Sequence, residues 1–401
     1  MNNFYASVAI LMNPMLKGKP VIVCGDPDRR HGIVLAKSNE AKKAGIKTGD
    51  TIWSAKQKIK DLITVPPDFK KYTEYSKKVY QIYTLYTPEV ESFGLDECWL
   101  DVSGCLKLYG NGEEIAKKIQ EHIRKDTGLT VSIGVSFTKI FAKLGSDMKK
   151  PDAITVITKE NYKQVVWSQE VSKMLFVGKS TEEKLNRLGI FTIGDLATYD
   201  KDLLIEKFGK VGKKLHSYAN GEEIEKVKEY TDIHIPESIG NGTTTEQDIT
   251  NFKDASSVIF ALCEVIAFRM REYSLVGLSI SISVRNKQLR SFSRQMTLDT
   301  MTDSSYEIAS NALQLLKKHY DFSRNLPLRT ITVSVSNLMS ARDFIQISLF
   351  EEDKNKKRNL EKSIDNLRNK YGFSILRRGI TMGTVFTCDA REVEDGFVPF
   401  H

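Results

Sequence analysis

Two adjacent carboxylates, Asp96 and Glu97, stand in the segment SFGLDECWLDVSG, between a glycine and an apolar stretch. Carboxylate oxygens are the ligands that a hard cation such as Mg²⁺ prefers. Neighbours on a regular strand point to opposite faces, so both side chains reach one ion only at a turn, which Gly94 allows. Spacing alone leaves a solvated hairpin tip equally open. Asp101, five residues on, is expected to cap a strand end.

The opening segment, MNNFYASVAILMNP, resembles the first palm motif of Y-family translesion DNA polymerases, and SFGLDECWLD resembles their Ser-x-Asp-Glu motif. The pattern is closest to the UmuC-like (ImpB/MucB/SamB) branch. The resemblance implies that Asp96 and Glu97 hold two Mg²⁺ ions, helped by the backbone carbonyl of Met1. It also implies that Phe4 and Tyr5 lie beneath the incoming nucleotide, with Tyr5 as a steric gate against a 2′-hydroxyl. Without it, both aromatics would be ordinary core residues.

Two further segments extend the resemblance to the nucleotide. AKSNEAKKAGIKTGDT resembles the finger segment, which implies nucleotide contacts for Asn39 and Lys42, with Lys42 on the triphosphate. SIGVSFTKIFAKLGSDMKKPDAITVI matches the long palm signature and makes Lys150 the phosphate-binding lysine. Cations suit this role because phosphoryl transfer depends on positioning and charge stabilisation. The other lysines of the segment have a weaker claim to this role, because a basic helix face is usually just solvated: Lys139, Lys143 and Lys149.

DNA contacts are expected in two later regions. Residues 176–197 and 206–221 resemble the helix-hairpin-helix elements of the thumb, in which amides at a glycine turn meet DNA phosphates. The implied residues are Gly178, Lys179, Gly209, Gly212 and Lys213. No acidic residue occurs between Tyr273 and Leu298, so this β-rich stretch predicts a basic ribbon that follows a phosphate backbone, as in the little finger. Its basic residues are Arg285, Lys287, Arg290 and Arg294.

The pentapeptide QISLF, Gln346 to Phe350, resembles the clamp-binding peptide of bacterial polymerases, with Gln346, Leu349 and Phe350 as anchors. An edge strand is the alternative. The implied partners are primer-template DNA, deoxynucleoside triphosphates and a sliding clamp. A UmuD-like subunit or a recombinase filament stays open.

The elements around these motifs alternate between strand and helix. PVIVC reads as a buried strand and NEAKKAG as a helix. A strand at residues 98–102, a helix carrying Ile115, Ile119 and Ile123, and a strand at 129–136 predict a ferredoxin-like sheet. Residues 162–229 lack strands and predict a helical domain. A second α/β sandwich follows, and then a helix that carries Leu360, Ile364, Leu367 and Tyr371.

The fold class predicted from the resemblance is α+β, a right hand with palm, small fingers, helical thumb and α/β little finger. The expected domains are palm and fingers at 1–160, with the fingers at about 12–68, thumb at 161–232, little finger at 240–342 and a tail at 343–401.

Composition agrees with this organisation. Lys plus Arg number 59 against 51 Asp plus Glu, a net charge of +8 that suits a polyanionic partner. Five cysteines without a CxxC pair indicate neither a zinc site nor a disulfide framework. No apolar run reaches the ~20 residues of a membrane helix, so a cytoplasmic protein without a membrane partner is expected.

The expected activity is error-prone, template-directed DNA synthesis past damage, as part of DNA repair and the SOS response. Two alternatives remain from the residues: a nucleotidyl cyclase, which also uses a ferredoxin-like palm with paired carboxylates, and a clamp-bound accessory subunit without catalysis.

One element of the resemblance is missing. Family members carry a hydrophobic strand ending in Asp, their third metal-binding carboxylate, directly before the residues that match MNNFYAS. We therefore expect the natural product to extend upstream by ~5 to 8 residues, the length of one strand, with an Asp directly before Met1. The alternative is a catalytic relic. If the natural product does extend upstream, the 401-residue form is expected to show little or no extension and reduced stability, and a form starting upstream is expected to be active.

Overall fold

The computed structural model describes residues 1–26, 32–222, 225–229, 235–341 and 351–381. The chain divides at residues 232 and 233 into two compact units, with residues 24–33 grouped with the second. The first unit contains the fingers, the palm and the thumb. The second contains a sheet, its helices and the C-terminal helix.

The fingers are built on a small sheet in the order β2-β1-β3. Strand β1 (Val21–Cys24) is buried along its whole length, as its apolar sequence predicts, and it pairs in parallel with β3 (Ile63–Val65). The remaining elements are β2 (Val34–Lys37), α2 (Asn39–Lys43) and α3 (Ile52–Lys58). Ser38 caps α2 by accepting a hydrogen bond from the Ala41 amide, so Asn39 is the first residue of this short helix and Lys42 lies in its last turn.

The palm consists of four principal helices and two separate pairs of strands. The helices are α1 (Phe4–Met12), α4 (Phe69–Thr84), α6 (Gly112–Thr127) and α7 (Lys139–Met148). Strands β4 (Val90–Ser92) and β5 (Cys98–Leu100) pair antiparallel, and β6 (Ile133–Ser136) and β7 (Ile154–Ile157) pair parallel. Short segments complete the palm: η1 (Pro14–Leu16), η2 (Ser103–Cys105) and α5 (Leu106–Tyr109).

The strand predicted at 129–136 is shorter than expected, because only Ile133–Ser136 is extended and paired. The Thr130 carbonyl instead accepts a hydrogen bond from the Asn2 amide. Among the described residues, no strand lies between β5 and β6 to hydrogen-bond the two pairs into one sheet. A cavity of about 410 Å³ is lined by both of these strands and by α6 and α7. This cavity contains the candidate site.

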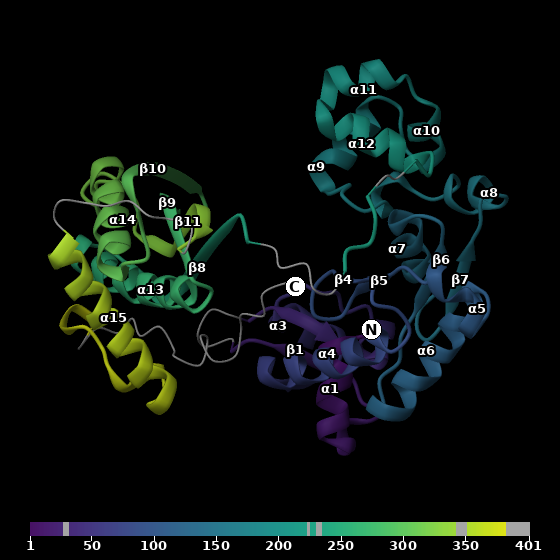
Figure 1. The fold of residues 1–401 in the computed structure, drawn as a ribbon, viewed down its shortest axis with the longest axis horizontal. Helices are drawn as coiled ribbons and strands as arrows, with labels where there is room; N and C mark the ends of the chain where they lie inside the picture. The colour runs from purple at the N-terminus through teal and green to yellow at the C-terminus, as the bar shows by residue number, and fades with distance from the viewer. Residues whose placement is uncertain (27–31, 223–224, 230–234, 342–350, 382–401) are drawn as a thin grey trace. The chain divides into compact units, whose positions relative to one another are not determined.

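The thumb is all helical, as the sequence predicts, and its helices cluster around one core (Figure 1). They are α8 (Tyr162–Val166), η3 (Val171–Lys173), α9 (Lys179–Arg187), α10 (Ile193–Thr198), α11 (Lys201–Phe208) and α12 (Lys210–Ala219). Thr192 and Asp195 form a capping box at the start of α10, and Asp200 caps α11.

The second unit is a four-stranded antiparallel sheet with two long helices packed on one face (Figure 1). The sheet order is β10-β9-β11-β8, formed by β8 (Ser238–Ile249), β9 (Leu275–Asn286), β10 (Ser291–Thr302) and β11 (Leu328–Ser340). The helices are α13 (Phe252–Glu272) and α14 (Ser305–His319). Alternate residues such as Ile280, Ile282 and Val333 fill the core between sheet and helices.

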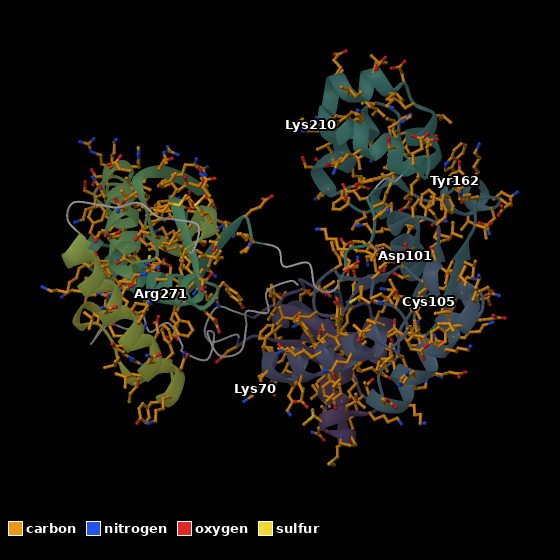
Figure 2. The ribbon with its side chains drawn as sticks, in the orientation of Figure 1. Lys70, Asp101, Cys105, Tyr162, Lys210 and Arg271 are labelled. Atoms are coloured by element: carbon orange, nitrogen blue, oxygen red, sulfur yellow. The ribbon has the colours of Figure 1, made fainter. Side chains whose placement is uncertain are left out.

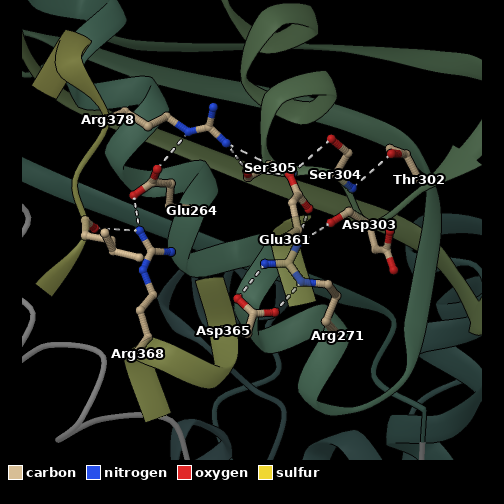
Figure 3. A network of polar contacts seen from close by, with 11 residues as sticks. Glu264, Arg271, Thr302, Asp303, Ser304, Ser305, Glu361, Asp365, Arg368 and Arg378 are labelled. Atoms are coloured by element: carbon tan, nitrogen blue, oxygen red, sulfur yellow. Dashed lines mark hydrogen bonds and ion pairs between the residues drawn. The ribbon is translucent and has the colours of Figure 1, made fainter. Parts of the chain in front are cut away.

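The C-terminal helix α15 (Glu351–Tyr371) is followed by η4 (Phe373–Ile375) and η5 (Gly379–Thr381). Charged side chains hold α15 against α13, within the second unit (Figure 3). No helix within the described ranges is long and apolar enough to cross a membrane.

Candidate active site

The loop between β4 and β5 presents Asp96 and Glu97 to the cavity. Gly94 adopts a φ of 92°, a conformation that favours glycine, and so provides the turn that the sequence predicted. The Phe93 amide donates to the Glu97 carbonyl at 2.8 Å and closes the loop. Asp101 accepts a hydrogen bond from the Ser103 amide at 2.9 Å, which confirms its predicted structural role.

Cations surround the two carboxylates. The Nζ atom of Lys143 lies 2.7 Å from Glu97 and 3.0 Å from Asp147, and Lys150 lies 2.7 Å from Asp147. Burial raises the pKa of Asp96, against the opposing charges of the Met1 ammonium, Lys143 and Lys150. A cavity carboxylate whose pKa is perturbed by burial and by specific charged neighbours is a candidate functional group.

Lys143 was expected on a solvated helix face, and the structure corrects this. Its side chain lies mostly buried in the cavity wall. Burial lowers the pKa of Lys143, but hydrogen bonds and charge from Glu97 and Asp147 outweigh it, so the pKa is raised overall. The one-turn spacing from Lys143 to Asp147 on α7 was the available signal. Lys139 is likewise paired, with Glu91 at 3.0 Å.

The Met1 ammonium also lies in the site. It donates to the Asp96 backbone carbonyl at 2.5 Å. Burial lowers its pKa, partly offset by the charges of Asp96 and Glu97. Metal binding by the Met1 carbonyl stays a prediction.

The donor set fits a divalent metal that arrives with its substrate. Among the residues described, no group of three or more His, Cys, Asp or Glu side chains could hold a metal alone. Asp96 and Glu97 offer hard oxygen donors at the cavity wall. Mg²⁺ is typically held by one or two carboxylates, with substrate phosphates and water completing its shell.

Tyr5 lies on α1 beside this site, where the charge of Asp96 contributes to raising its pKa after the larger effect of burial. Its ring stacks on Tyr72, with centroids 4.1 Å apart and planes at 11°, and meets Phe69 edge-on. Phe4 is 4% exposed and belongs to the palm core. The structure therefore supports a partly buried ring at Tyr5, fixed by its stacking, and a packing role for Phe4, whose nucleotide contact stays a prediction.

The fingers place the side chain of Asn39 beside the N-terminal residues of the chain and carry basic side chains close by. The Asn3 side chain donates to Asn39 at 2.8 Å and so joins the palm to α2. Lys42 is exposed on α2. Burial lowers the pKa of Lys37, and the nearby charge of Lys42 lowers it further. Lys37, which the sequence reasoning missed, therefore forms a basic pair with Lys42.

The thumb helices differ at their N-termini. Gly178 and Gly209 are the N-cap residues of α9 and α12, so neither helix has a side-chain cap. No atom from elsewhere in the chain lies within 4 Å of a Cβ added at either glycine. The exposed cations beside them are Lys179, Lys210 and Lys213, and Lys210 is labelled in Figure 2. Gly212 is different, because an added Cβ would lie 2.2 Å from the Leu204 carbonyl. The close approach of α11 and α12 therefore accounts for this glycine.

The β9–β10 hairpin carries all four predicted basic residues on exposed positions: Arg285, Lys287, Arg290 and Arg294. The sheet face opposite the helices is rich in hydroxyl groups, which the sequence reasoning missed. Ser281 lies opposite Ser334, with their hydroxyl oxygens 2.7 Å apart, and Ser283 lies opposite Thr332. The alternation in LSISISVRN and ITVSVSNL was the signal for this face. The peptide Gln346–Phe350 lies outside the described residues.

Comparison with family models gives three matches along the chain. Residues 1–147 match the impB/mucB/samB family, and residues 236–349 match its C-terminal domain. Residues 176–223 match the thumb domain of DNA polymerase iota. A chimeric Y-family DNA polymerase of known structure superposes with a TM-score of 0.73 at 25% identity, covering 84% of this chain and 97% of that one. The fold and these matches define a right-hand polymerase of the Y-family type, as the sequence predicted.

Curated relatives agree over almost the whole length. DNA polymerase IV of Acetivibrio thermocellus is 45% identical, covering 95% of this chain and 96% of the relative. DNA polymerase IV of Clostridium kluyveri is 35% identical, covering 94% and 96%. DNA polymerase IV 2 of Bacillus subtilis is 34% identical, covering 95% and 93%. The chain belongs to the impB/mucB/samB family of Y-family DNA polymerases. This membership favours a DNA-directed DNA polymerase over the cyclase and the inactive accessory subunit.

Proposed function

We propose that this translesion polymerase uses the β4–β5 loop as its catalytic centre. Asp96 and Glu97 would hold two Mg²⁺ ions there during transfer of a deoxynucleotide to a primer 3′-hydroxyl. The observation that carries the proposal is that both carboxylates line one cavity with Lys143 and Lys150. Bound metal would supply charge neutralisation on the phosphates and activation of the attacking oxygen.

The chain's own residues bind and position the substrates. Lys150 on the palm, with Lys42 on the fingers, would receive the triphosphate as fixed cations. Lys143 lies 2.7 Å from Glu97 and would thereby position that proposed metal ligand. Tyr5 would meet the sugar with a ring whose orientation is set by the stacked Tyr72.

The DNA would be held by two surfaces that do not read sequence. The uncapped N-termini of α9 and α12 leave amides that suit phosphate oxygens, with Lys179 and Lys213 adjacent. The basic hairpin and the hydroxyl face of the β9–β11 sheet suit the same partner. These contacts give salt-dependent binding with little sequence preference.

The proposed tether is the peptide Gln346–Phe350 bound to a sliding clamp. Binding to a clamp that is already on the DNA raises the effective concentration of the polymerase at the primer. It does so without adding catalytic contacts. Deleting the five residues should leave synthesis on a short primer unchanged and abolish stimulation by a loaded clamp. Equal stimulation with and without them would contradict the tether.

Primer extension tests the catalytic assignment. The protein, given Mg²⁺ and the four deoxynucleotides, is expected to extend a primer on an undamaged template and past an abasic site. Extension should depend on template sequence and on divalent metal. Failure on both templates, by a protein that still binds them, would overturn the proposed catalytic role.

A further inference from the structure

A mostly buried ion pair connects strand β4 of the palm to helix α7. A carboxylate oxygen of Glu91 on β4 lies 3.0 Å from the Nζ atom of Lys139, and the two side chains are only 15% and 10% exposed. A buried ion pair costs free energy unless further hydrogen bonds satisfy both of its groups. The further partners of this pair therefore indicate what it is for.

These further partners are main-chain atoms of a segment far away in the sequence. Glu91 accepts a hydrogen bond from the Lys228 amide at 3.0 Å. Lys139 donates from Nζ to the Lys226 carbonyl at 3.4 Å. We call residues 225–228 the strap, and Glu91 with Lys139 the clasp.

The strap runs from the thumb to the palm. At the thumb end, Glu225 lies 2.9 Å from Lys214 on α12, and its hydrogen bond with this lysine lowers the pKa of Glu225. At the other end the clasp binds the main chain. Residues 225–227 also line the cavity that contains Asp96 and Glu97. The strap thus joins a thumb helix to the strand pair that presents the proposed metal ligands.

The clasp is itself fixed to the palm. Glu91 lies opposite Trp99 in the β4–β5 ladder. The indole N–H of Trp99 donates to the Lys139 carbonyl at 3.0 Å, and the Lys139 ammonium lies 5.1 Å from the centroid of the same ring. Both strands and the start of α7 therefore hold the clasp in place, and the strap is bound by an ordered part of the palm.

We propose that Glu91 and Lys139 are positioning residues, which hold the strap and thereby brace the thumb against the palm when DNA binds. This inference rests on the proposed binding of DNA phosphates by the thumb helices. The thumb must meet the duplex while the primer end stays at Asp96 and Glu97. A protein whose strap is open has a smaller binding-competent fraction, and its apparent affinity for DNA falls by that fraction.

The clasp recognises the strap through main-chain atoms. Lys228 contributes its amide and Lys226 its carbonyl, while the side chains of both residues are exposed. Lys228→Pro therefore removes the donor and leaves every palm residue unchanged. Lys228→Ala is the matched control, because it removes the same positive charge and keeps the amide.

Hydrogen exchange of the full chain, measured by mass spectrometry, reports opening of the strap. In Lys228→Pro the remaining amides of residues 225–229 should exchange about 10-fold faster than in Lys228→Ala, since a hydrogen bond to a charged group is lost. Helices α4 and α6 should exchange equally in the two variants, which excludes misfolding of the palm. Equal exchange of the strap in both variants would overturn the clasp.

Fluorescence anisotropy with a primer-template measures the effect on DNA binding. Lys228→Pro should bind roughly 5-fold more weakly than Lys228→Ala, in proportion to the lost braced population. The single-turnover rate at saturating DNA should differ by less than about 2-fold, because Asp96 and Glu97 are unchanged. An open strap with equal DNA affinity in the two variants would overturn the brace.

A second variant approaches the contact from the palm. Glu91→Ala with Lys139→Ala removes both charges of the clasp, so no unpaired charge stays buried. In this background Lys228→Pro and Lys228→Ala should bind DNA equally, because the contact that distinguishes them is gone. A difference that persists would overturn the clasp.

Failure of the proposed function has its own signature. Lys179→Gln with Lys213→Gln should weaken DNA binding if the thumb holds phosphates, and normal affinity would overturn that proposed function together with the brace. If this variant binds weakly while Lys228→Pro and Lys228→Ala bind equally, only the brace is overturned. Exchange and anisotropy are both measured without catalysis, so a loss of primer extension does not affect either result.

Discussion

The Nζ atom of Lys143 on α7 lies 2.7 Å from a carboxylate oxygen of Glu97 in the β4–β5 loop. This ion pair connects the helix of the long palm signature to one of the two carboxylates that we assign to metal binding. The pair is mostly buried, so its charges interact more strongly than they would in water. Lys143 therefore holds Glu97 in place, and it would compete with any metal that this carboxylate binds.

Replacing Lys143 by Gln separates these two effects. We expect Mn²⁺ to bind about 5-fold more tightly without nucleotide, because loss of one nearby cation is worth roughly 1 kcal/mol or more. Primer extension should nevertheless slow by ~10-fold, because Glu97 is no longer held. Lys139→Gln, whose lysine pairs with Glu91, is the matched control and should leave Mn²⁺ affinity unchanged. Unchanged Mn²⁺ affinity in the Lys143 variant would refute the competition.

The pH dependence follows from Asp96, whose pKa is raised by burial. A metal binds the ionised form, so Mn²⁺ affinity should fall as pH drops through this raised pKa, above the ~4 of an ordinary Asp. Without metal, the folded state holds the proton more tightly than the unfolded state. The free energy of unfolding should then decrease as pH rises from the ordinary to the raised pKa. Asp96→Asn should remove the pH dependence of Mn²⁺ affinity in metal titrations. It should also remove this contribution to the pH dependence of the free energy of unfolding in urea denaturation.

Tyr5→Ala should open the sugar pocket and admit ribonucleotides, with discrimination against them falling by ~100-fold. The Ala variant lacks the phenol ring that we expect to block a 2′-hydroxyl. In the wild-type chain the centroid of this ring lies 4.1 Å from that of Tyr72. Tyr5→Phe is the control, because it keeps the ring and should keep discrimination. Single-nucleotide incorporation with matched ribo- and deoxynucleotides measures the ratio, and an unchanged ratio in the Ala variant would remove Tyr5 from this role.

Arg285→Gln and Arg294→Gln should each lower the slope of log affinity for duplex DNA against log salt. The expected change is about 0.9 for each phosphate that the variant no longer neutralises. Arg324→Gln is the control, since Arg324 is 86% exposed in the same unit and pairs with Asp321. Fluorescence anisotropy over a range of salt gives the slopes, and equal slopes in all three variants would exclude the hairpin from the DNA interface.

Local pattern was enough to predict many of the elements. The turn at Gly94, the buried strand β1 and the helix α6 with Ile115, Ile119 and Ile123 inside follow from glycine conformation and apolar periodicity. The thumb was recognisable from its glycines and lack of strands. These features depend on residues close in sequence, which a single sequence displays directly.

Features that depend on distant residues were less accessible. The apolar residues of α15 suggest a packed stripe, yet Glu361, Asp365 and Arg368 form the buried side. Their partners Arg271 and Glu264 lie about a hundred positions away on α13. Lys143 was misplaced for the same reason, since its partner Glu97 belongs to another element.

The central claim is that Asp96 and Glu97 act in chemistry and not in DNA binding. Single-turnover incorporation by the protein, measured by rapid quench beside anisotropy on the same primer-template, tests it most directly. Asp96→Asn and Glu97→Gln should each lower the incorporation rate by ~1,000-fold or more, since they remove a group acting on the transition state, while DNA affinity changes less than about 3-fold. A near-normal rate in either variant, or a rate loss matched by loss of DNA binding, would contradict the account.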